Sequence, residues 1–309
     1  MDKKMTSGEI AKKAGVSQKA VRLYDEKGLL KPTEYSEGNY RLYDKEALEI
    51  LEKIVALKHT VPGEDWYVKV FGSVDLGPGE KVLDLGCGFS KIWRNNWKDI
   101  PQGTKIYAYD LRGTWADDFA NYLEENKGGL PEGVNIDIIF EDLEKQPAWD
   151  LINKDKTYSR IIAHYVFSEL KDPEALIAKA AGVLDKNGFF SVNGPDVTTW
   201  NFFFKDAMKE AGIDAPFIDE TIATQEQERD SFYAMAGKYF ANIDIIELHS
   251  SFRYDKADDL LLRMKDAYEG QDKFFAKNQD KIKAYFAEKI VEKGEIFITT
   301  DSHFLHCSN

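Results

Sequence analysis

Short apolar runs that lead into a carboxylate recur through the middle of the chain. Three of them occupy the stretches Val82–Asp84, Ile106–Asp110 and Ile136–Asp142. A short continuous apolar run that ends in a polar turn is typical of a strand buried on both faces of a parallel sheet. The pattern therefore predicts three neighbouring parallel strands that deliver Asp84, Asp110 and Asp142 to the same edge.

Longer stretches with helical patterning lie between and after these strands. We expect helices over residues 66–74, 115–126, 173–184, 200–212, 224–239, 257–268 and 272–293. Two extended segments, 243–248 and 296–307, come late in the chain, the second with a bend at Thr300-Asp301-Ser302. Alternating strands and helices predict an α/β fold with a mostly parallel sheet.

The first sixty residues have a different pattern. A short helix over 5–14 and a tight turn precede Ser17, which suits the N-cap of a helix over 18–26 that ends at Gly28. Glu37-Gly38-Asn39 reads as a hairpin turn between Tyr35 and Tyr43, and Asp44 as the cap of a helix to about residue 57. This is the pattern of a helix-turn-helix with a wing.

A helix-breaking segment, Val61-Pro62-Gly63, follows this unit. The sequence therefore predicts two domains, residues 1–60 and residues 64–309.

The net negative charge of the chain comes from the larger predicted domain. Residues 1–60 hold 12 Lys and Arg against 10 Asp and Glu, a net of +2, whereas the remaining residues hold 29 against 44, a net of −15. Such a balance disfavours a nucleic-acid substrate for the larger domain, and a small neutral or cationic molecule fits better.

The chain carries no targeting or cross-linking signal that would change this picture. No apolar run approaches the length of about 20 residues that spans a bilayer, and the N-terminus lacks the apolar region of a signal peptide. Two cysteines do not make a disulfide framework. We expect a cytoplasmic protein with no membrane partner.

The glycine-rich turn after the first strand, Asp84-Leu85-Gly86-Cys87-Gly88, is the strongest candidate for ligand binding. Glycine lets the backbone approach a nucleotide-like ligand, because no Cβ stands in the way. A dinucleotide site would need a third glycine three positions after Gly88, where this chain has Lys91. The carboxylate of Asp110 suits the two hydroxyls of a ribose, and that of Asp142 suits an adenine amino group.

These motifs resemble the class I S-adenosylmethionine-dependent methyltransferases. VLDLGCGFS matches their first motif, Asp110 and Asp142 the second and third, RIIAHYVFSELKDP their fourth strand and loop, and LDKNGFFSVNG their fifth strand. Ser90 stands where many members carry a third glycine. The resemblance implies a Rossmann-like sheet with an antiparallel edge strand, and S-adenosyl-L-methionine as cofactor. The implied cofactor-binding residues are Asp84, Gly86, Cys87, Gly88, Asp110, Leu111, Asp142, Leu143 and Tyr165.

Candidate catalytic side chains follow the fourth strand. A general base is needed only when the methyl acceptor must first lose a proton. His164, Tyr165 and Glu169 are the candidates, with Ser168 and Asp196 as further ones, and the resemblance favours Tyr165 as a neighbour of cofactor or substrate.

Three late residues, His303, His306 and Cys307, are candidate metal ligands by type alone. On a strand, positions 303 and 306 point to opposite faces. We therefore expect no metal site there.

The N-terminal stretches IAKKAGVSQKAVRLYDEKGLLKP and NYRLYDKEALEIL resemble the DNA-binding domain of MerR-type regulators. The resemblance places Ser17, Lys19, Arg22 and Tyr24 on the recognition helix and makes Arg41 and Tyr43 wing contacts to phosphate. Leu23 departs from a usual tyrosine. The long dimerisation helix of that family has no counterpart after residue 60, so we expect only weak DNA binding without dimerisation.

Two functions follow from these resemblances. The first is methyl transfer to a small-molecule acceptor by an enzyme with an appended DNA-binding module. The alternative is a MerR-type transcriptional regulator whose methyltransferase-like domain senses a ligand. An intact set of cofactor residues favours the first, and the sequence leaves open the acceptor, the methylated atom and the oligomeric state.

Overall fold

The computed structural model describes residues 4–14, 16, 18–26, 30–36, 38, 40–57, 65–113, 116–155 and 157–309. The chain forms two compact units. One consists of Asp65–Lys205, Ala215–Ser250 and Thr300–Asn309, and the other of Met1–Glu64, Asp206–Asp214 and Ser251–Thr299. Among the described residues, no helix combines the length and the apolar character needed to cross a bilayer.

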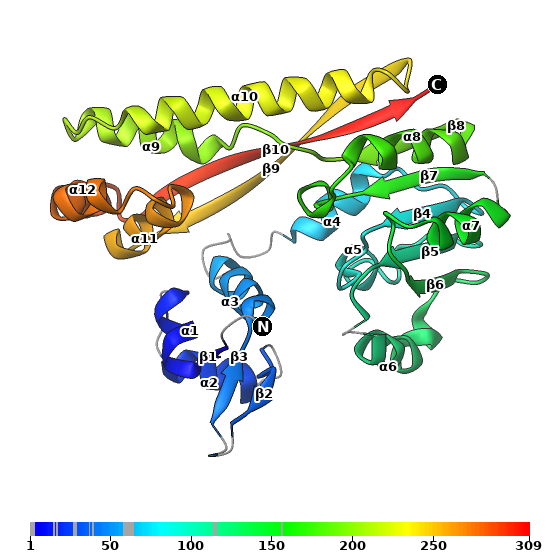
Figure 1. The fold of residues 1–309 in the computed structure, drawn as a ribbon, viewed down its shortest axis with the longest axis horizontal. Helices are drawn as coiled ribbons and strands as arrows, with labels where there is room; N and C mark the ends of the chain where they lie inside the picture. Colours follow the sequence, from blue (N-terminus) through cyan, green and yellow to red (C-terminus); the bar gives the residue numbers. More distant parts are fainter. Residues whose placement is uncertain are drawn as a thin grey trace. The chain divides into compact units, whose positions relative to one another are not determined.

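A seven-stranded sheet organises the larger part of the chain (Figure 1), and its spatial order is β6-β5-β4-β7-β8-β10-β9. The strands are β4 (Lys81–Leu85), β5 (Lys105–Asp110), β6 (Asn135–Phe140), β7 (Tyr158–Ala163), β8 (Leu184–Val192), β9 (Asn242–Tyr254) and β10 (Ile296–Ser308). The strands from β6 to β8 are parallel, and β10 is antiparallel to β8. The predicted Rossmann-like sheet with an antiparallel strand towards one edge is therefore confirmed.

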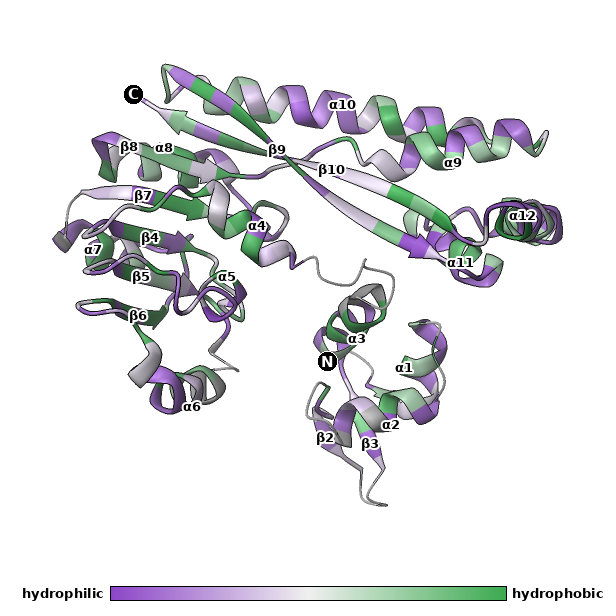
Figure 2. Ribbon diagram, turned by 180° about the vertical axis from the view of Figure 1, so that it is seen from behind, coloured by the Kyte–Doolittle hydropathy of each residue, from purple (hydrophilic) through white to green (hydrophobic). Residues whose placement is uncertain are grey.

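Helices cover both faces of the sheet. They are α4 (Trp66–Ser73), α5 (Lys91–Arg94), α6 (Ala116–Asn126), α7 (Gln146–Asp155), α8 (Pro173–Val183) and α10 (Pro216–Ala236), and α9 (Thr199–Glu210) precedes α10 in the chain. Alternate strand residues point to opposite faces, so Leu83 and Phe190 pack with α7, α8 and α10, while Val82 and Ile106 pack with α4, α5 and α6. Figure 2 shows the middle strands as largely hydrophobic and α10 as mixed, as expected for a buried sheet under an amphipathic helix.

The sequence predicted α12 (Asp272–Lys293) at its observed limits and α11 (Ala257–Ala267) within one residue. It predicted α10 from residue 224, but this helix begins at Pro216, which occupies its first turn and is followed by buried Phe217 and Ile218. The bend expected at 300–302 is absent, because β10 continues through it and the Asp301 amide donates to Thr199 Oγ1.

The N-terminal elements are β1 (Met5–Thr6), α1 (Ser7–Lys13), α2 (Gln18–Glu26), β2 (Glu34–Tyr35), β3 (Arg41–Tyr43) and α3 (Lys45–Leu57). Sequence analysis placed residues 5 and 6 in a helix, but Met5 pairs with Tyr43 as a strand. Thr6 instead caps α1 in a capping box with Glu9. Asp44 caps α3 as predicted, accepting from the Ala47 amide at 2.9 Å.

Several positions used in the sequence analysis lie outside the described residues. They are Ser17, Gly28, Glu37, Asn39 and the predicted domain boundary at residues 61–63.

Gly188 in β8 provides a test of how closely β8 approaches β7. A Cβ built at Gly188 would lie 2.5 Å from the backbone oxygen of Ser159, where the register of the two strands shifts. We expect Gly188→Ala to lower the free energy of unfolding by roughly 1–3 kcal/mol, because the clash is with backbone. Chemical denaturation followed by tryptophan fluorescence measures this.

Gly182→Ala is the matched control. Gly182 lies in the last turn of α8 with no atom within 4 Å of a built Cβ. Alanine should stabilise this helix by about 0.5–1 kcal/mol. Equal effects of the two substitutions would contradict the packing described for β7 and β8.

Candidate active site

The turn after β4 is fastened to β5 by its backbone. The amides of Gly86 and Cys87 both donate to the Tyr109 carbonyl, at 2.8 and 3.0 Å. Gly86 has a φ of +83°, and a Cβ there would lie 2.6 Å from Val166 Cγ2. Glycine is therefore required at position 86 both by the backbone conformation and by the loop after β7.

Gly88 and Asp110 form the centre of this edge of the sheet. The Gly88 amide donates to Asp110 Oδ2 at 2.8 Å, and the Arg112 amide donates to Asp110 Oδ1 at 2.9 Å. Gly88 has a φ of +52°, and no atom lies within 4 Å of a Cβ built on it. Two backbone amides therefore orient the largely buried Asp110 carboxylate next to the glycine turn.

Asp84 faces the protein interior. It is 3% exposed, and the Trp93 indole Nε1 donates to its Oδ2 at 2.7 Å. Burial raises the pKa of Asp84 to about 7, with a smaller contribution from the charge of Asp110 and an opposing one from the Trp93 hydrogen bond. Its contact joins β4 to α5, so within the described residues its carboxylate serves the fold of the turn.

The residues that follow β5 and β6 differ in how far their side chains are exposed. Leu111 is 66% exposed directly after Asp110, whereas the Leu143 side chain is buried in the core. The Asp142 carboxylate accepts from the Glu144 amide at 3.0 Å and pairs with Lys145 at 3.2 Å, and these contacts lower its pKa. Leu111 and Asp142 thus present side chains at this edge, whereas the Leu143 side chain is buried and its carbonyl accepts from the Trp149 indole at 2.7 Å.

Tyr165 takes an unusual backbone conformation in the loop after β7. Its φ is +59°, its amide donates to Asn193 Oδ1 at 2.7 Å, and its hydroxyl accepts from the Trp66 indole at 2.8 Å. Its ring is half exposed and lies edge-on to Phe304. A non-glycine residue with positive φ at this edge is typical of a functional site.

The other two catalytic candidates have partners of their own. His164 Nε2 hydrogen-bonds Ser191 Oγ at 2.8 Å, and burial lowers the pKa of His164 to about 3. Glu169 forms an exposed ion pair with Arg112 at 3.3 Å.

His303, considered by type alone as a metal ligand, pairs instead with Asp196. Its Nδ1 lies 2.7 Å from Asp196 Oδ2, and its backbone amide donates to the same oxygen at 3.3 Å. His306 stacks on Phe189 and Cys307 is buried, so the three late residues do not meet. Sequence reasoning missed the pair because its members are 107 positions apart. The one sequence signal for the pair was the expectation that the last two strands lie at the edge of the sheet.

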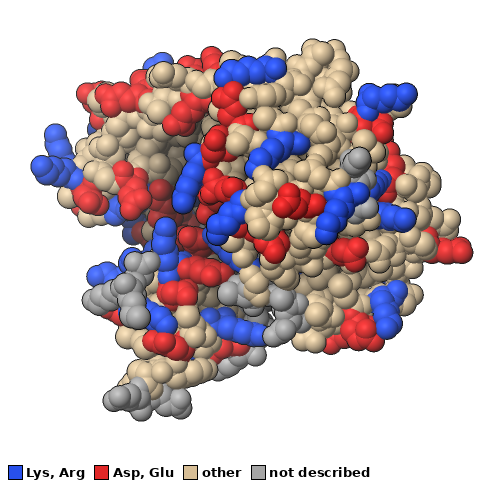
Figure 3. Space-filling view, turned by 45° about the vertical axis from the view of Figure 1, so that its right-hand side comes forward, with Lys and Arg blue, Asp and Glu red and all other residues tan. Residues whose placement is uncertain are grey.

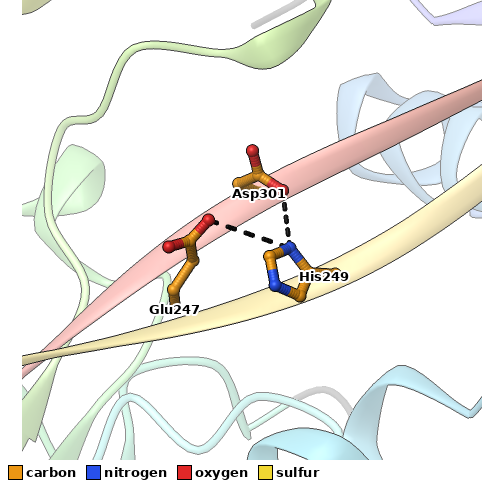
Figure 4. Close-up of side chains that lie close together, drawn as sticks. All are labelled: Glu247, His249 and Asp301. Atoms are coloured by element: carbon orange, nitrogen blue, oxygen red, sulfur yellow. Dashed lines mark hydrogen bonds and ion pairs between the residues drawn. The ribbon is translucent and has the colours of Figure 1, made fainter.

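Figure 4 shows the one His and carboxylate group with metal-ligand spacing among the described residues, formed by Glu247, His249 and Asp301. Their ligand atoms lie within 4.8 Å of one another, and His249 Nδ1 is 2.7 Å from Asp301 Oδ1. All three side chains are at least one-third exposed. The hydrogen bond between His249 and Asp301 accounts for this arrangement without an ion.

The candidate DNA-reading residues have mixed environments. Lys19 and Arg22 are exposed on α2, whereas Tyr24 packs against the core of the helix-turn-helix. Arg41 forms an ion pair with Asp25. The prediction for Tyr43 is corrected, because its ring is fully buried and cannot reach a phosphate. On the face drawn in Figure 3, Lys and Arg are interspersed with Asp and Glu.

Comparison with known proteins separates the two parts of the chain. The family model described as MerR HTH family regulatory protein matches residues 5–61. The chain is 45% identical over 47 residues to the regulator CueR of Salmonella typhimurium, which is 15% of this chain and 34% of that protein.

A second relative matches a longer stretch of the chain. Over 188 residues, 60% of the chain, it is 30% identical to malonyl-(acyl-carrier protein) O-methyltransferase of Halalkalibacterium halodurans and covers 64% of that protein. A crystal structure from Bacillus halodurans C-125, assigned as a methyltransferase, aligns with a TM-score of 0.46 and 16% identity over 79% of this chain and 99% of the other.

The chain spans less than two thirds of the length of these curated relatives. The MerR match thus falls on the described helix-turn-helix elements, and the seven-stranded sheet that follows has a Rossmann-like fold.

The buried carboxyl of Asp84 predicts a pH dependence of stability. Between its unfolded pKa, near 4, and about 7, only the folded protein keeps the proton, so the stabilising contribution is complete below pH 4 and is lost as the pH rises through 7. Asp84→Asn removes the titration and keeps an acceptor for Trp93.

The unfolding free energies of wild type and Asp84→Asn should therefore diverge between pH 5 and 7. As the pH rises, the unfolding free energy of Asp84→Asn should increase relative to that of wild type by about 1.4 kcal/mol per pH unit. Urea denaturation at several pH values measures this, and parallel curves for the two proteins would refute a raised pKa at Asp84.

Proposed function

We propose that this chain transfers a methyl group from S-adenosyl-L-methionine to a small-molecule acceptor. The observation that carries the proposal is the Gly88 amide bound to the Asp110 carboxylate beside an open glycine backbone. The 30% identity to a methyltransferase over 188 residues supports the same reaction class.

The residues present fit this cofactor. Each Asp110 oxygen uses one lone pair on a backbone amide and keeps another for a ribose hydroxyl. Asp142 would accept from the adenine amino group, exposed Leu111 would cover one face of the base, and the Gly86–Gly88 backbone would pack along the amino-acid part. When bound, the cofactor supplies a methyl group on a positively charged sulfur.

The protein's part in this reaction is mainly to position the donor and the acceptor. Aligned reactants at near-attack distance gain much of the rate of a displacement. Tyr165, held by Asn193 and Trp66, would form a wall of the site next to the glycine turn. A net charge of −15 outside residues 1–60 favours a neutral or cationic acceptor over nucleic acid.

A second function, DNA binding by residues 1–60, is supported by the MerR match over residues 5–61. Lys19 and Arg22 are exposed on the expected recognition helix and would enter the major groove, and Arg41 would contact phosphate from the wing. The alternative function is a MerR-type transcriptional regulator whose methyltransferase-like domain senses a ligand. We retain residues 1–60 and 64–309 as the proposed domains and a cytoplasmic location.

Calorimetry with S-adenosylmethionine and S-adenosylhomocysteine tests the cofactor assignment. We expect micromolar-range dissociation constants for wild type. Asp110→Asn should weaken both by at least about tenfold, because a hydrogen bond to a charged group is worth about 1.5–3 kcal/mol.

Asp137→Asn is the control for this experiment. Asp137 is an exposed carboxylate on β6, and its loss should leave binding unchanged. Wild-type affinity in folded Asp110→Asn would remove Asp110 from the ribose role, and no binding by wild type would overturn the proposed activity.

Electrophoretic shift assays with the duplex upstream of the coding region test the second function. We expect weak binding at physiological salt. Arg41→Ala should weaken binding to all sequences about equally and reduce the salt slope by about one phosphate contact.

Lys293→Ala removes a positive charge from α12 and serves as the control for Arg41→Ala. Tight, sequence-selective binding by a monomer would make gene regulation the primary function instead.

A further inference from the structure

The hydrogen bonds of Asp196 fix the orientation and the protonation of His303. One carboxylate oxygen of Asp196 accepts from the Val197 amide at 2.8 Å, and the other faces His303 Nδ1 at 2.7 Å and its backbone amide at 3.3 Å. A carboxylate only accepts hydrogen bonds, so Nδ1 carries the proton and Nε2 keeps a lone pair. No described residue hydrogen-bonds Nε2, and the side chain is 31% exposed.

A series of direct contacts links this pair to the glycine turn. Gly86 lies against Val166, and the amide of the neighbouring Tyr165 donates to Asn193 Oδ1 in the loop after β8. Asp196 follows three residues later. β10 brings His303 to the same edge, because Leu305 lies opposite Val192, the last residue of β8. The pair therefore lies at the carboxyl edge that also carries Asp110.

The other candidates for a base are less suited to proton transfer. His164 is occupied by Ser191 through Nε2, and Glu169 is paired with Arg112. The Tyr165 hydroxyl accepts from Trp66, and a neutral tyrosine is a poor base. Compared with these three candidates, His303 has a lone pair that is oriented by a partner and accepts no hydrogen bond from a described residue.

We propose that His303, oriented by Asp196, is the general base of the methyl transfer and that the acceptor is a phenolic hydroxyl. This rests on the proposed function. An imidazole nitrogen can take the proton of a phenolic hydroxyl, whereas a carboxylate acceptor is already ionised and would need no base. Asp196 is a positioning residue, because it acts through the imidazole.

The proposed step balances as follows for atoms and charge. His303 Nε2 takes the proton of the acceptor O–H while the oxygen lone pair forms the new bond to the methyl carbon, and the electron pair of the broken C–S bond stays on sulfur. The products are an aryl methyl ether, a neutral thioether and an imidazolium, which returns its proton to water.

Other charged groups influence the same pair. Arg229 and Tyr233 on α10 lie within electrostatic reach of Asp196. Asp301 precedes His303 by two positions on β10. A pH profile must therefore be compared between variants that leave these groups unchanged.

The first measurement needs no acceptor. Two-bond ¹⁵N–¹H spectra of histidine-labelled protein should show that the neutral form of His303 carries its proton at Nδ1 and none at Nε2, and Asp196→Asn should produce a mixture of tautomers. A proton on Nε2 in wild type would overturn the proposal.

The second measurement uses a panel of phenols and carboxylic acids with S-adenosylmethionine, and product masses identify the acceptors. We expect wild type to methylate phenols. His303→Gln should lower kcat by about 100-fold or more with little change in KM, and it should abolish the loss of rate at acidic pH. Asp196→Asn should lower kcat strongly, and Asp196→Glu should restore part of it. His249→Gln, an exposed histidine on β9, is the matched control.

The outcomes separate this proposal from the one it rests on. If wild type does not bind S-adenosylhomocysteine in calorimetry, the proposed function itself fails. If wild type and His303→Gln both bind it, and the variant methylates phenols at the wild-type rate, the base assignment is overturned. Methylation of carboxylic acids but no phenol by wild type also overturns it.

Discussion

The hydrogen bond from the Gly88 amide to Asp110 is the constraint on which the candidate site depends. It joins the end of β4 to the end of β5 and holds the carboxylate where both its oxygens face backbone amides. The Tyr109 carbonyl reinforces the joint by accepting from Gly86 and Cys87. Three backbone donors therefore hold the turn against one strand end, so its shape does not depend on a ligand.

The Asp84 carboxyl supports this turn from the protein interior, where burial disfavours its charged form. A buried carboxyl is tolerated when it is hydrogen-bonded or when it keeps its proton, and Asp84 has both means through Trp93 and a raised pKa. The contact anchors the four-residue α5, which is too short to be stable alone. In this structure the buried Asp84 carboxyl therefore orients the glycine turn through Trp93.

The strands of the sheet were predictable because a strand buried on both faces must be apolar along its length. Residues 82–85, apart from Asp84, and residues 106–109 are apolar or aromatic, and both stretches became central strands. Elements defined by distant partners were not predictable in the same way. Met5 belongs to a strand only because Tyr43 pairs with it, and β9 extends to Tyr254 beyond its apolar start.

The same difference applies within the site. Local sequence identified Gly86, Gly88 and Asp110, since the turn and the strand end are both encoded within a few residues. It could not identify the partner of Asp196, because the pair forms only when β10 runs antiparallel beside β8. Tyr43 shows the opposite error. The resemblance placed it among the wing contacts to phosphate, but its ring is buried in the core.

The buried Tyr43 also bears on how the two parts of this chain can act. With its ring in the core, Tyr43 adds no phosphate contact. Of the three basic residues proposed to contact DNA, Lys19 and Arg22 are exposed and Arg41 is already paired with Asp25. Each phosphate contact adds only a modest electrostatic gain, so we expect DNA binding that rests on these few contacts to be weak. The proposed methyl-transfer site differs in this respect, because the glycine turn, Asp110 and the His303–Asp196 pair all belong to one compact unit of the chain.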